Sequence, residues 1–136
     1  MSNFSVTFRH RDDPAGAGAP VCVLDLHGEL DAHTAGEFEA ALQKCLDEGH
    51  TRLVVHGPAL DYVSSAGLGV FMAFLEPIRQ GGGDLKIAAL QPRVFNVFDL
   101  LGFPMLFDIV ETEDAALARF GASEQAPDDA PVASPS

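Results

Sequence analysis

Ser64 and Ser65 stand side by side where a predicted helix begins, and they are the residues best placed to carry chemistry. A serine hydroxyl at this position can cap an unpaired backbone N–H group, which stabilises the helix by about 1 kcal/mol. The same hydroxyl can instead accept a phosphate, because the helix dipole and the free N–H groups stabilise the added negative charge. These residues alone leave both uses open.

A serine could also act as a hydrolytic nucleophile, which requires a neighbouring base and an oxyanion hole. His56, at the end of a predicted strand, is the nearest candidate base. No motif supplies the oxyanion hole or a third group that would orient the base. We therefore predict no catalytic residues and a protein that is not an enzyme.

Cofactor and metal motifs are also missing from the sequence. The run Gly67-Leu68-Gly69 is not a dinucleotide fingerprint, because Met72 stands where the third glycine would fall. The five histidines lack the spacing of zinc ligands. Both cysteines, Cys22 and Cys45, fall at predicted core positions, so we expect reduced thiols, no disulfide and no metal.

The charge balance excludes several classes of partner. The chain of 136 residues has 20 acidic and 8 basic side chains, which give a formal net charge of -12. Such a surface repels phosphate backbones and anionic lipids, so we expect neither nucleic acid nor membrane as a partner. No apolar run approaches the roughly 18 residues of a membrane span, and the first residues lack the apolar core of a signal peptide. These patterns predict a cytoplasmic protein.

Predicted strands and helices alternate along the chain, which indicates one α/β domain with a mixed sheet of about five strands and four helices packed on it. The strands are predicted at residues 4–9, 21–26, 52–56, 84–89 and 107–110. The helices are predicted at residues 34–48, from 65 onwards, at 92–101 and at 113–120. The domain is therefore expected to span residues 1–120. Residues 121–136, rich in Ala, Pro and Ser and acidic, predict a disordered tail.

Local motifs add detail to this plan. Thr34 and Glu37 have the spacing of a capping box, and Pro77 is expected to kink or shorten the second long helix. Residues 11–20 are expected to form a flexible hairpin connection. The third helix is predicted to bury an apolar stripe, consisting of Val94, Val97, Phe98 and Leu101. Phe95 falls off this stripe and, with the later Phe103, Met105 and Phe107, could form an exposed partner surface.

Three segments, in this order and spacing, resemble the STAS family, and most closely the bacterial anti-sigma factor antagonists. They are Gly28-Glu29-Leu30-Asp31, Ser64-Ser65-Ala66-Gly67-Leu68-Gly69 and Leu101-Gly102-Phe103. The resemblance covers about residues 4–120. In the family pattern Asp-Ser-Ser/Thr-Gly-Leu-Gly, the serine after the aspartate accepts a phosphate from a partner kinase. Alignment places this acceptor at Ser65, with Ser64 as the second choice.

The chain departs from the family pattern at two positions. Ser64 stands where the family has aspartate, and Ala66 stands at the second hydroxyl position. Asp31 matches a family aspartate beside the same surface, although an exposed aspartate in a turn needs no such role. The partner-binding residues implied by the resemblance are Asp31, Ser64, Ser65, Ala66, Gly67 and Leu68.

The resemblance implies a partner switch. The unphosphorylated chain would bind an anti-sigma factor with an ATP-binding kinase fold, which would release the sigma factor. That serine kinase would phosphorylate Ser65 and lose its antagonist, and a serine phosphatase would reset the chain. ATP and Mg²⁺ would belong to the partner. Two alternatives stay open: a STAS subunit that docks on a transport ATPase and is never phosphorylated, and a structural module of a larger signalling assembly.

Overall fold

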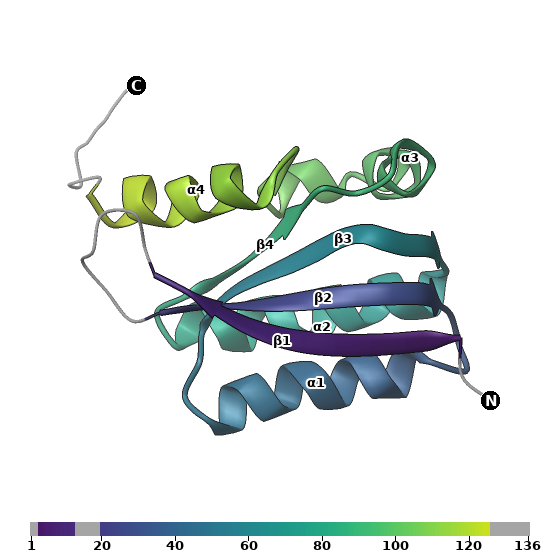
Figure 1. The fold of residues 1–136 in the computed structure, drawn as a ribbon, viewed down its shortest axis with the longest axis horizontal. Helices are drawn as coiled ribbons and strands as arrows, with labels where there is room; N and C mark the ends of the chain where they lie inside the picture. The colour runs from purple at the N-terminus through teal and green to yellow at the C-terminus, as the bar shows by residue number, and fades with distance from the viewer. Residues whose placement is uncertain (1–2, 13–19, 126–136) are drawn as a thin grey trace.

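The computed structural model describes residues 3–12 and 20–125. Within them the chain forms one five-stranded sheet, in which the strands follow chain order from β1 to β5 (Figure 1). β1 runs antiparallel to β2, and the remaining neighbours are parallel. The strands are β1 (Phe4–Arg11), β2 (Val21–Leu30), β3 (Arg52–Val63), β4 (Asp84–Ala88) and β5 (Ile109–Val110). The predicted α/β fold with a mixed sheet is confirmed.

Helices cover both faces of this sheet (Figure 1). They are α1 (Ala35–Asp47), α2 (Ser65–Gln80), α3 (Pro92–Leu100), the short 3₁₀ helix η1 (Phe103–Met105) and α4 (Glu113–Gln125). α1 and α2 pack on one face, where the larger core lies, and α4 packs on the other face over a smaller core. β2 and β3 lie inside the sheet, and helices cover both of their faces. Their first halves are therefore nearly continuous apolar runs.

Aromatic packing holds α3 and η1 against α2. The ring of Phe71 in α2 lies 5.3 Å from that of Phe98 and 6.1 Å from that of Phe107, both edge to face. Phe103 contacts the same rings, and Phe71 and Phe98 are fully buried. Such pairs add about 0.5–1.5 kcal/mol to the burial of their area. They fix α3 beside the end of the sheet where β3 terminates.

β2 and β3 are longer than predicted. β3 continues beyond residue 56 to Val63, and its later residues pair with β2 as far as Leu30 opposite Val63. Gly57 and Pro58 mask this continuation, because this pair is typical of a turn and the residues after it show no alternation. The ladder with β2 supplies the hydrogen bonds instead. The turn that carries the serines therefore starts directly at the end of a strand.

Three further predictions need correction. α2 is not shortened at Pro77 but continues to Gln80; the carbonyl that loses its partner belongs to Ala73, which is exposed to water. β5 has two residues only, since Phe107 is buried among the aromatic rings instead of joining the strand. Leu101 is 59% exposed, because α3 ends at Leu100 and the left-handed Gly102 turns the chain away.

Parts of two predictions fall beyond the described residues. α4 reaches Gln125, past the predicted helix end at residue 120, and residues 126–136 of the predicted tail are not described. Residues 13–19 of the predicted hairpin connection are likewise outside the description. Among the helices that are described, none combines the length and the apolar character that a membrane span requires.

Candidate functional site

The turns that follow β2 and β3 lie side by side at the carboxyl end of the sheet. Leu30 and Val63 are register partners in the parallel pair, so Asp31 and Ser64 each come directly after a strand end. The backbone N–H of Ser64 donates to the carbonyl oxygen of Leu30 at 2.9 Å, which ties the two turns together. Carboxyl ends of parallel strands are the usual location of sites in open α/β sheets. The predicted Asp31 and serine positions are thus brought together.

The two serines have different surroundings. Ser64 is the N-cap of α2, with extended backbone, and its Oγ accepts a hydrogen bond from the N–H of Gly67 at 3.4 Å. Ser65 is the first helical residue and is exposed, and its hydroxyl bonds to no other residue in the described part of the chain. The first turn of α2 contains no acidic residue. Ser64 therefore stabilises the helix, whereas the hydroxyl of Ser65 is available.

Asp31 organises the neighbouring turn. Its Oδ1 accepts hydrogen bonds from the backbone N–H groups of His33 at 2.8 Å and Thr34 at 3.2 Å. The Thr34 hydroxyl donates to the carbonyl of Glu29 and accepts from the N–H of Asp31. The predicted capping box is therefore wrong, since the Thr34 hydroxyl is used inside the turn. With 32% of its side chain exposed, Asp31 still presents charge to solvent.

The remaining predicted binding residues divide between the surface and the interior. Ala66 is half-buried, while Gly67 and Leu68 are buried beneath the surface. A Cβ atom on Gly67 would lie 2.6 Å from Cγ of Leu30, so only glycine lets α2 approach β2 this closely. Gly69, by contrast, is exposed and has open space around it. We call Asp31, on the turn after β2, and Ser65, Ala66 and Gly69, in the first turns of α2, the serine surface.

A groove beside the serine surface was missed by the sequence analysis. It has a volume of about 270 Å³ and lies between the end of β3 and α3. Its lining residues are Asp61, Tyr62, Val63, Arg93, Val94 and Val97. The sequence does contain one signal for this groove, which is Arg93 directly after Pro92 at the predicted start of a helix. A positive charge is unfavourable at a helix N-terminus, so its presence there indicates a use other than stability.

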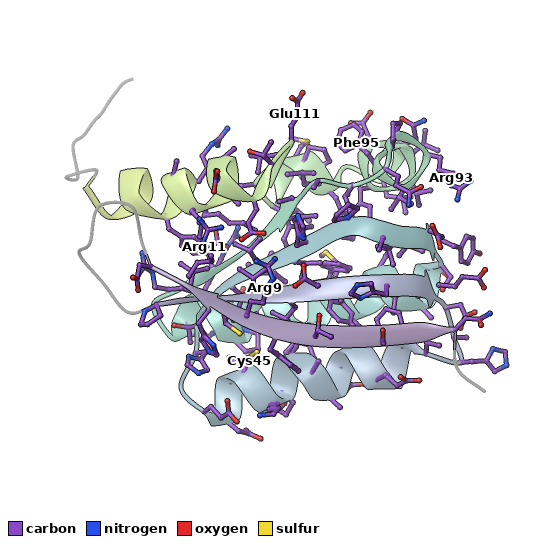
Figure 2. All side chains as sticks on the ribbon, viewed as in Figure 1. Arg9, Arg11, Cys45, Arg93, Phe95 and Glu111 are labelled. Carbon is purple, nitrogen blue, oxygen red and sulfur yellow. The ribbon has the colours of Figure 1, made fainter. Side chains whose placement is uncertain are left out.

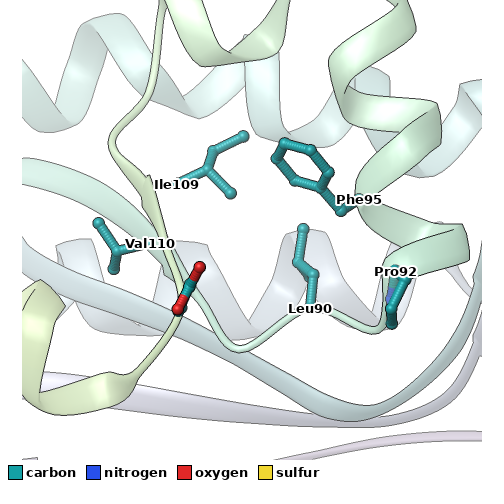
Figure 3. A pocket seen from close by; sticks show the side chains of 6 residues that line it. Leu90, Pro92, Phe95, Ile109 and Val110 are labelled. Carbon is teal, nitrogen blue, oxygen red and sulfur yellow. The ribbon is translucent and has the colours of Figure 1, made fainter.

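A second groove, of about 410 Å³, lies between α3 and β5. Figure 3 shows the side chains of Leu90, Phe95 and Ile109 pointing toward one another there. Phe95, predicted off the buried stripe, is half-buried in this groove. Phe103 and Phe107 lie in the core instead, while Met105 is 89% exposed. The predicted partner surface around Phe95 is thus not one continuous patch.

A charged network lies under α4, on the face of the sheet that α1 and α2 do not cover. Arg9 contacts the carboxylates of Asp25 at 2.6 Å and Glu113 at 2.7 Å, and Arg11 also contacts Glu113 (Arg9 and Arg11 are labelled in Figure 2). His56 Nδ1 lies 2.7 Å from Asp25 Oδ1. His56 therefore faces α4 and offers no base to Ser65, which follows from the alternation of side chains along β3.

This network lowers the pKa values of the carboxyl groups of Asp25 and Glu113. Burial raises the pKa of Asp25, but the hydrogen bonds from Arg9 and His56 together outweigh it, and the pKa lies below its ordinary value. The hydrogen bond from Arg9 lowers the pKa of Glu113, against the effect of burial and with further help from Arg11. Both groups are therefore held as carboxylates by their partners.

The two cysteines lie next to each other in the larger core. Cys22 and Cys45 are free and buried, with their Sγ atoms 3.8 Å apart. Within the described ranges no group of three or more His, Cys, Asp or Glu side chains is arranged to hold a metal ion.

A mixed five-stranded sheet with an aspartate turn and a serine-capped helix side by side at its carboxyl end defines a STAS-type regulatory domain. The sequence matches the STAS domain over residues 14–116, and the chain belongs to this family. Within the family it is of the anti-sigma factor antagonist type, as its relatives are.

Three similar proteins support this assignment. The chain is 37% identical over 95 residues to BtrV of Bordetella bronchiseptica, named as a candidate anti-sigma factor antagonist, covering 70% of this chain and 82% of BtrV. It is 32% identical over 84 residues to the anti-sigma-B factor antagonist of Staphylococcus epidermidis, covering 62% of this chain and 78% of that protein. An anti-sigma factor antagonist from Mycobacterium paratuberculosis has the same fold, with a TM-score of 0.71 and 26% identity over 86% of this chain and 95% of that one.

Proposed function

We propose that this chain is an anti-sigma factor antagonist that binds a kinase-type anti-sigma factor and is switched off by phosphorylation of Ser65. The observation that supports this proposal most directly is that the two serines have different surroundings. Ser64 caps α2 through its side chain, which leaves the exposed Ser65 hydroxyl free at the helix N-terminus. Ser64 is the second choice as acceptor, because its hydroxyl is half-buried and already accepts the N–H of Gly67.

The serine surface suits a protein partner. Its side chains are small, so the backbone of a partner can approach α2 closely. Asp31 is held by two backbone N–H groups and so presents its charge in a defined position. In this proposal the partner has an ATP-binding kinase fold and supplies the Mg²⁺ and ATP. The Ser65 oxygen bonds to the γ-phosphorus as the bond to ADP breaks, and the hydroxyl proton leaves to the partner.

Phosphorylation would end the complex by electrostatics and desolvation. A phosphate adds about 1.5 to 2 negative charges, which the N-terminus of α2 tolerates in the free chain. Inside an interface the same charge must lose its water and lies on the turn next to Asp31. If these effects amount to about 1.4–4 kcal/mol, the affinity falls about 10- to 1,000-fold.

The replacement of the family aspartate by Ser64 is compatible with this role. A carboxylate at this position would cap the helix, and the Ser64 hydroxyl accepts the same backbone N–H. The acceptor at Ser65 therefore sits on a capped helix in either case. A serine phosphatase would remove the phosphate and restore binding. The proposal places the chain in the cytoplasm, where sigma factors act, and assigns it no catalytic step of its own.

The test is phosphorylation by the purified kinase-type anti-sigma factor of the same organism with Mg²⁺ and ATP. Intact-mass spectrometry and site mapping should find one phosphate on Ser65. Ser64→Ala should still be phosphorylated, Ser65→Ala should not be, and Ser65→Asp should lose most of its affinity for the partner. Absence of phosphate, with equal partner affinity for Ser65→Ala and Ser65→Asp, would favour the docking-subunit alternative and contradict the proposal.

A further inference from the structure

Arg93 differs from every other basic side chain of the protein. The described residues include all eight Lys and Arg residues, and within them Arg93 makes no ion pair, hydrogen bond or ring contact. Each of the others contacts a carboxylate or an aromatic ring: Arg9, Arg11, Lys44, Arg79, Lys86 and Arg119 contact carboxylates, and Arg52 lies over the ring of Phe120. With 20 acidic residues available, one exposed arginine without a partner needs an explanation.

The fold gains nothing from a cation at this position. Arg93 is the second residue of α3, where the helix dipole disfavours positive charge. Asp61 lines the same groove, yet its carboxylate accepts a hydrogen bond from the side-chain amide of Gln91 at 3.1 Å instead of pairing with Arg93. Gln91 is itself anchored on the carbonyl of Pro58. The carboxylate that lines this groove is thus engaged by Gln91, and Arg93 stays open.

The groove that Arg93 borders has apolar walls. Tyr62, half exposed, lines it from β3, and Val94 and Val97 line it from α3, enclosing about 270 Å³. Figure 2 shows Arg93 on α3 at the end of the molecule where β3 terminates. Val63, which follows Tyr62 and also lines the groove, is the residue before the two serines. The groove therefore adjoins the serine surface.

We propose that this groove is a specificity contact for the anti-sigma factor: it takes an apolar side chain of the partner, beside a carboxylate that pairs with Arg93. This inference rests on the proposed function and adds the chemistry of the contact. The charges favour an acidic partner segment, because Arg93 is the one uncompensated cation beside the serine surface. The chain as a whole, with its net charge of -12, repels such a segment, so a local cation is needed to attract it.

The decisive comparison is between Arg93→Glu and Lys44→Glu. Both variants change the net charge equally, and Lys44 is an exposed side chain on α1 that pairs with Glu48. Affinity for the purified kinase-type anti-sigma factor should fall about 10-fold or more for Arg93→Glu and less than about 2-fold for Lys44→Glu at 0.1 M salt. A partner Asp→Arg or Glu→Arg variant should restore the binding of Arg93→Glu. Arg93→Glu should not unfold the domain, since an acid suits a helix N-terminus.

Each outcome separates the two proposals. If the wild type binds and Ser65→Asp does not, but Arg93→Glu binds like Lys44→Glu, the groove proposal is overturned and the switch stands. If Arg93→Glu changed the affinity of the phosphorylated chain only, the groove proposal would also be overturned, because Arg93 would then contact the phosphate of Ser65 and not the partner. If the wild type does not bind, the switch fails. In that case an NMR titration with the peptide acetyl-Leu-Glu-Leu-amide tests whether the groove binds an acidic apolar segment. If the Tyr62 and Val97 signals do not shift at millimolar peptide, the groove proposal is overturned.

Discussion

The backbone of Gly67 lies so close to Leu30 that a Cβ atom at Gly67 would stand 2.6 Å from Cγ of Leu30 and 3.2 Å from its carbonyl oxygen. The same carbonyl accepts the N–H of Ser64. The first turn of α2 therefore rests directly on the last residue of β2. The placement of Ser65 next to Asp31 depends on this contact.

Substitution of the two glycines in α2 should have opposite effects. Gly67→Ala forces α2 away from Leu30 and should lower the free energy of unfolding by about 1–3 kcal/mol. Gly69→Ala meets open space and should raise it by up to about 1 kcal/mol, because glycine is a poor helix former. Urea unfolding followed by circular dichroism measures both. Equal values for the two variants would contradict the close packing.

The two serines should separate in stability measurements. Ser64→Ala removes the side-chain cap of α2 and should cost about 1 kcal/mol. Ser65→Ala removes an exposed hydroxyl that bonds to no other described residue, so it should change the unfolding free energy by less than about 0.5 kcal/mol. Ser64→Asp, which restores the family residue, should keep the cap and serves as the control. A larger loss for Ser65→Ala than for Ser64→Ala would reverse the assignment of cap and acceptor.

Asp31 should stabilise its turn as well as present charge. Asp31→Ala leaves two backbone N–H groups without their side-chain acceptor and should cost about 1–2 kcal/mol in thermal or urea unfolding. Asp31→Asn keeps an oxygen acceptor and should retain most of the stability. If both variants unfolded like the wild type, the side-chain hydrogen bonds would contribute nothing.

The charged network under α4 should make the domain sensitive to acid. Asp25 and Glu113 have pKa values below their ordinary ones, so their contribution is present above the unfolded-state pKa and is lost as the pH falls through the folded-state pKa. The unfolding free energy should be nearly constant from about pH 7 to 5 and should fall below about pH 4.

Arg9→Met tests the origin of this acid sensitivity. The variant removes the cation shared by both carboxylates, so it should cost about 1 kcal/mol at pH 7 and flatten the decline below pH 4. Arg93→Met, which removes an unpaired cation, should keep the wild-type pH profile. A profile for Arg9→Met that parallels the wild type at every pH would show that the network does not cause the acid loss.

Patterns within single elements were sufficient for the fold. Helices were predicted at residues 34–48 and from residue 65 onwards, and α1 and α2 occupy Ala35–Asp47 and Ser65–Gln80. Alternation of strands and helices predicted the sheet and its four helices. Such patterns are readable because burial repeats with the period of each element. The start of α2 at Ser65 was also predicted correctly.

Contacts between the ends of different elements could not be predicted in this way. Which serine caps α2, how Thr34 is used and why Gly67 must be glycine all depend on the packing of α2 against Leu30 and on the register of β2 with β3. The missing partner of Arg93 depends on where every acidic side chain lies in space. The sequence by itself determined the elements and their buried faces, because these follow from local periodicity. The tertiary structure decided the site, because its atoms come from turns that only the assembled sheet brings together.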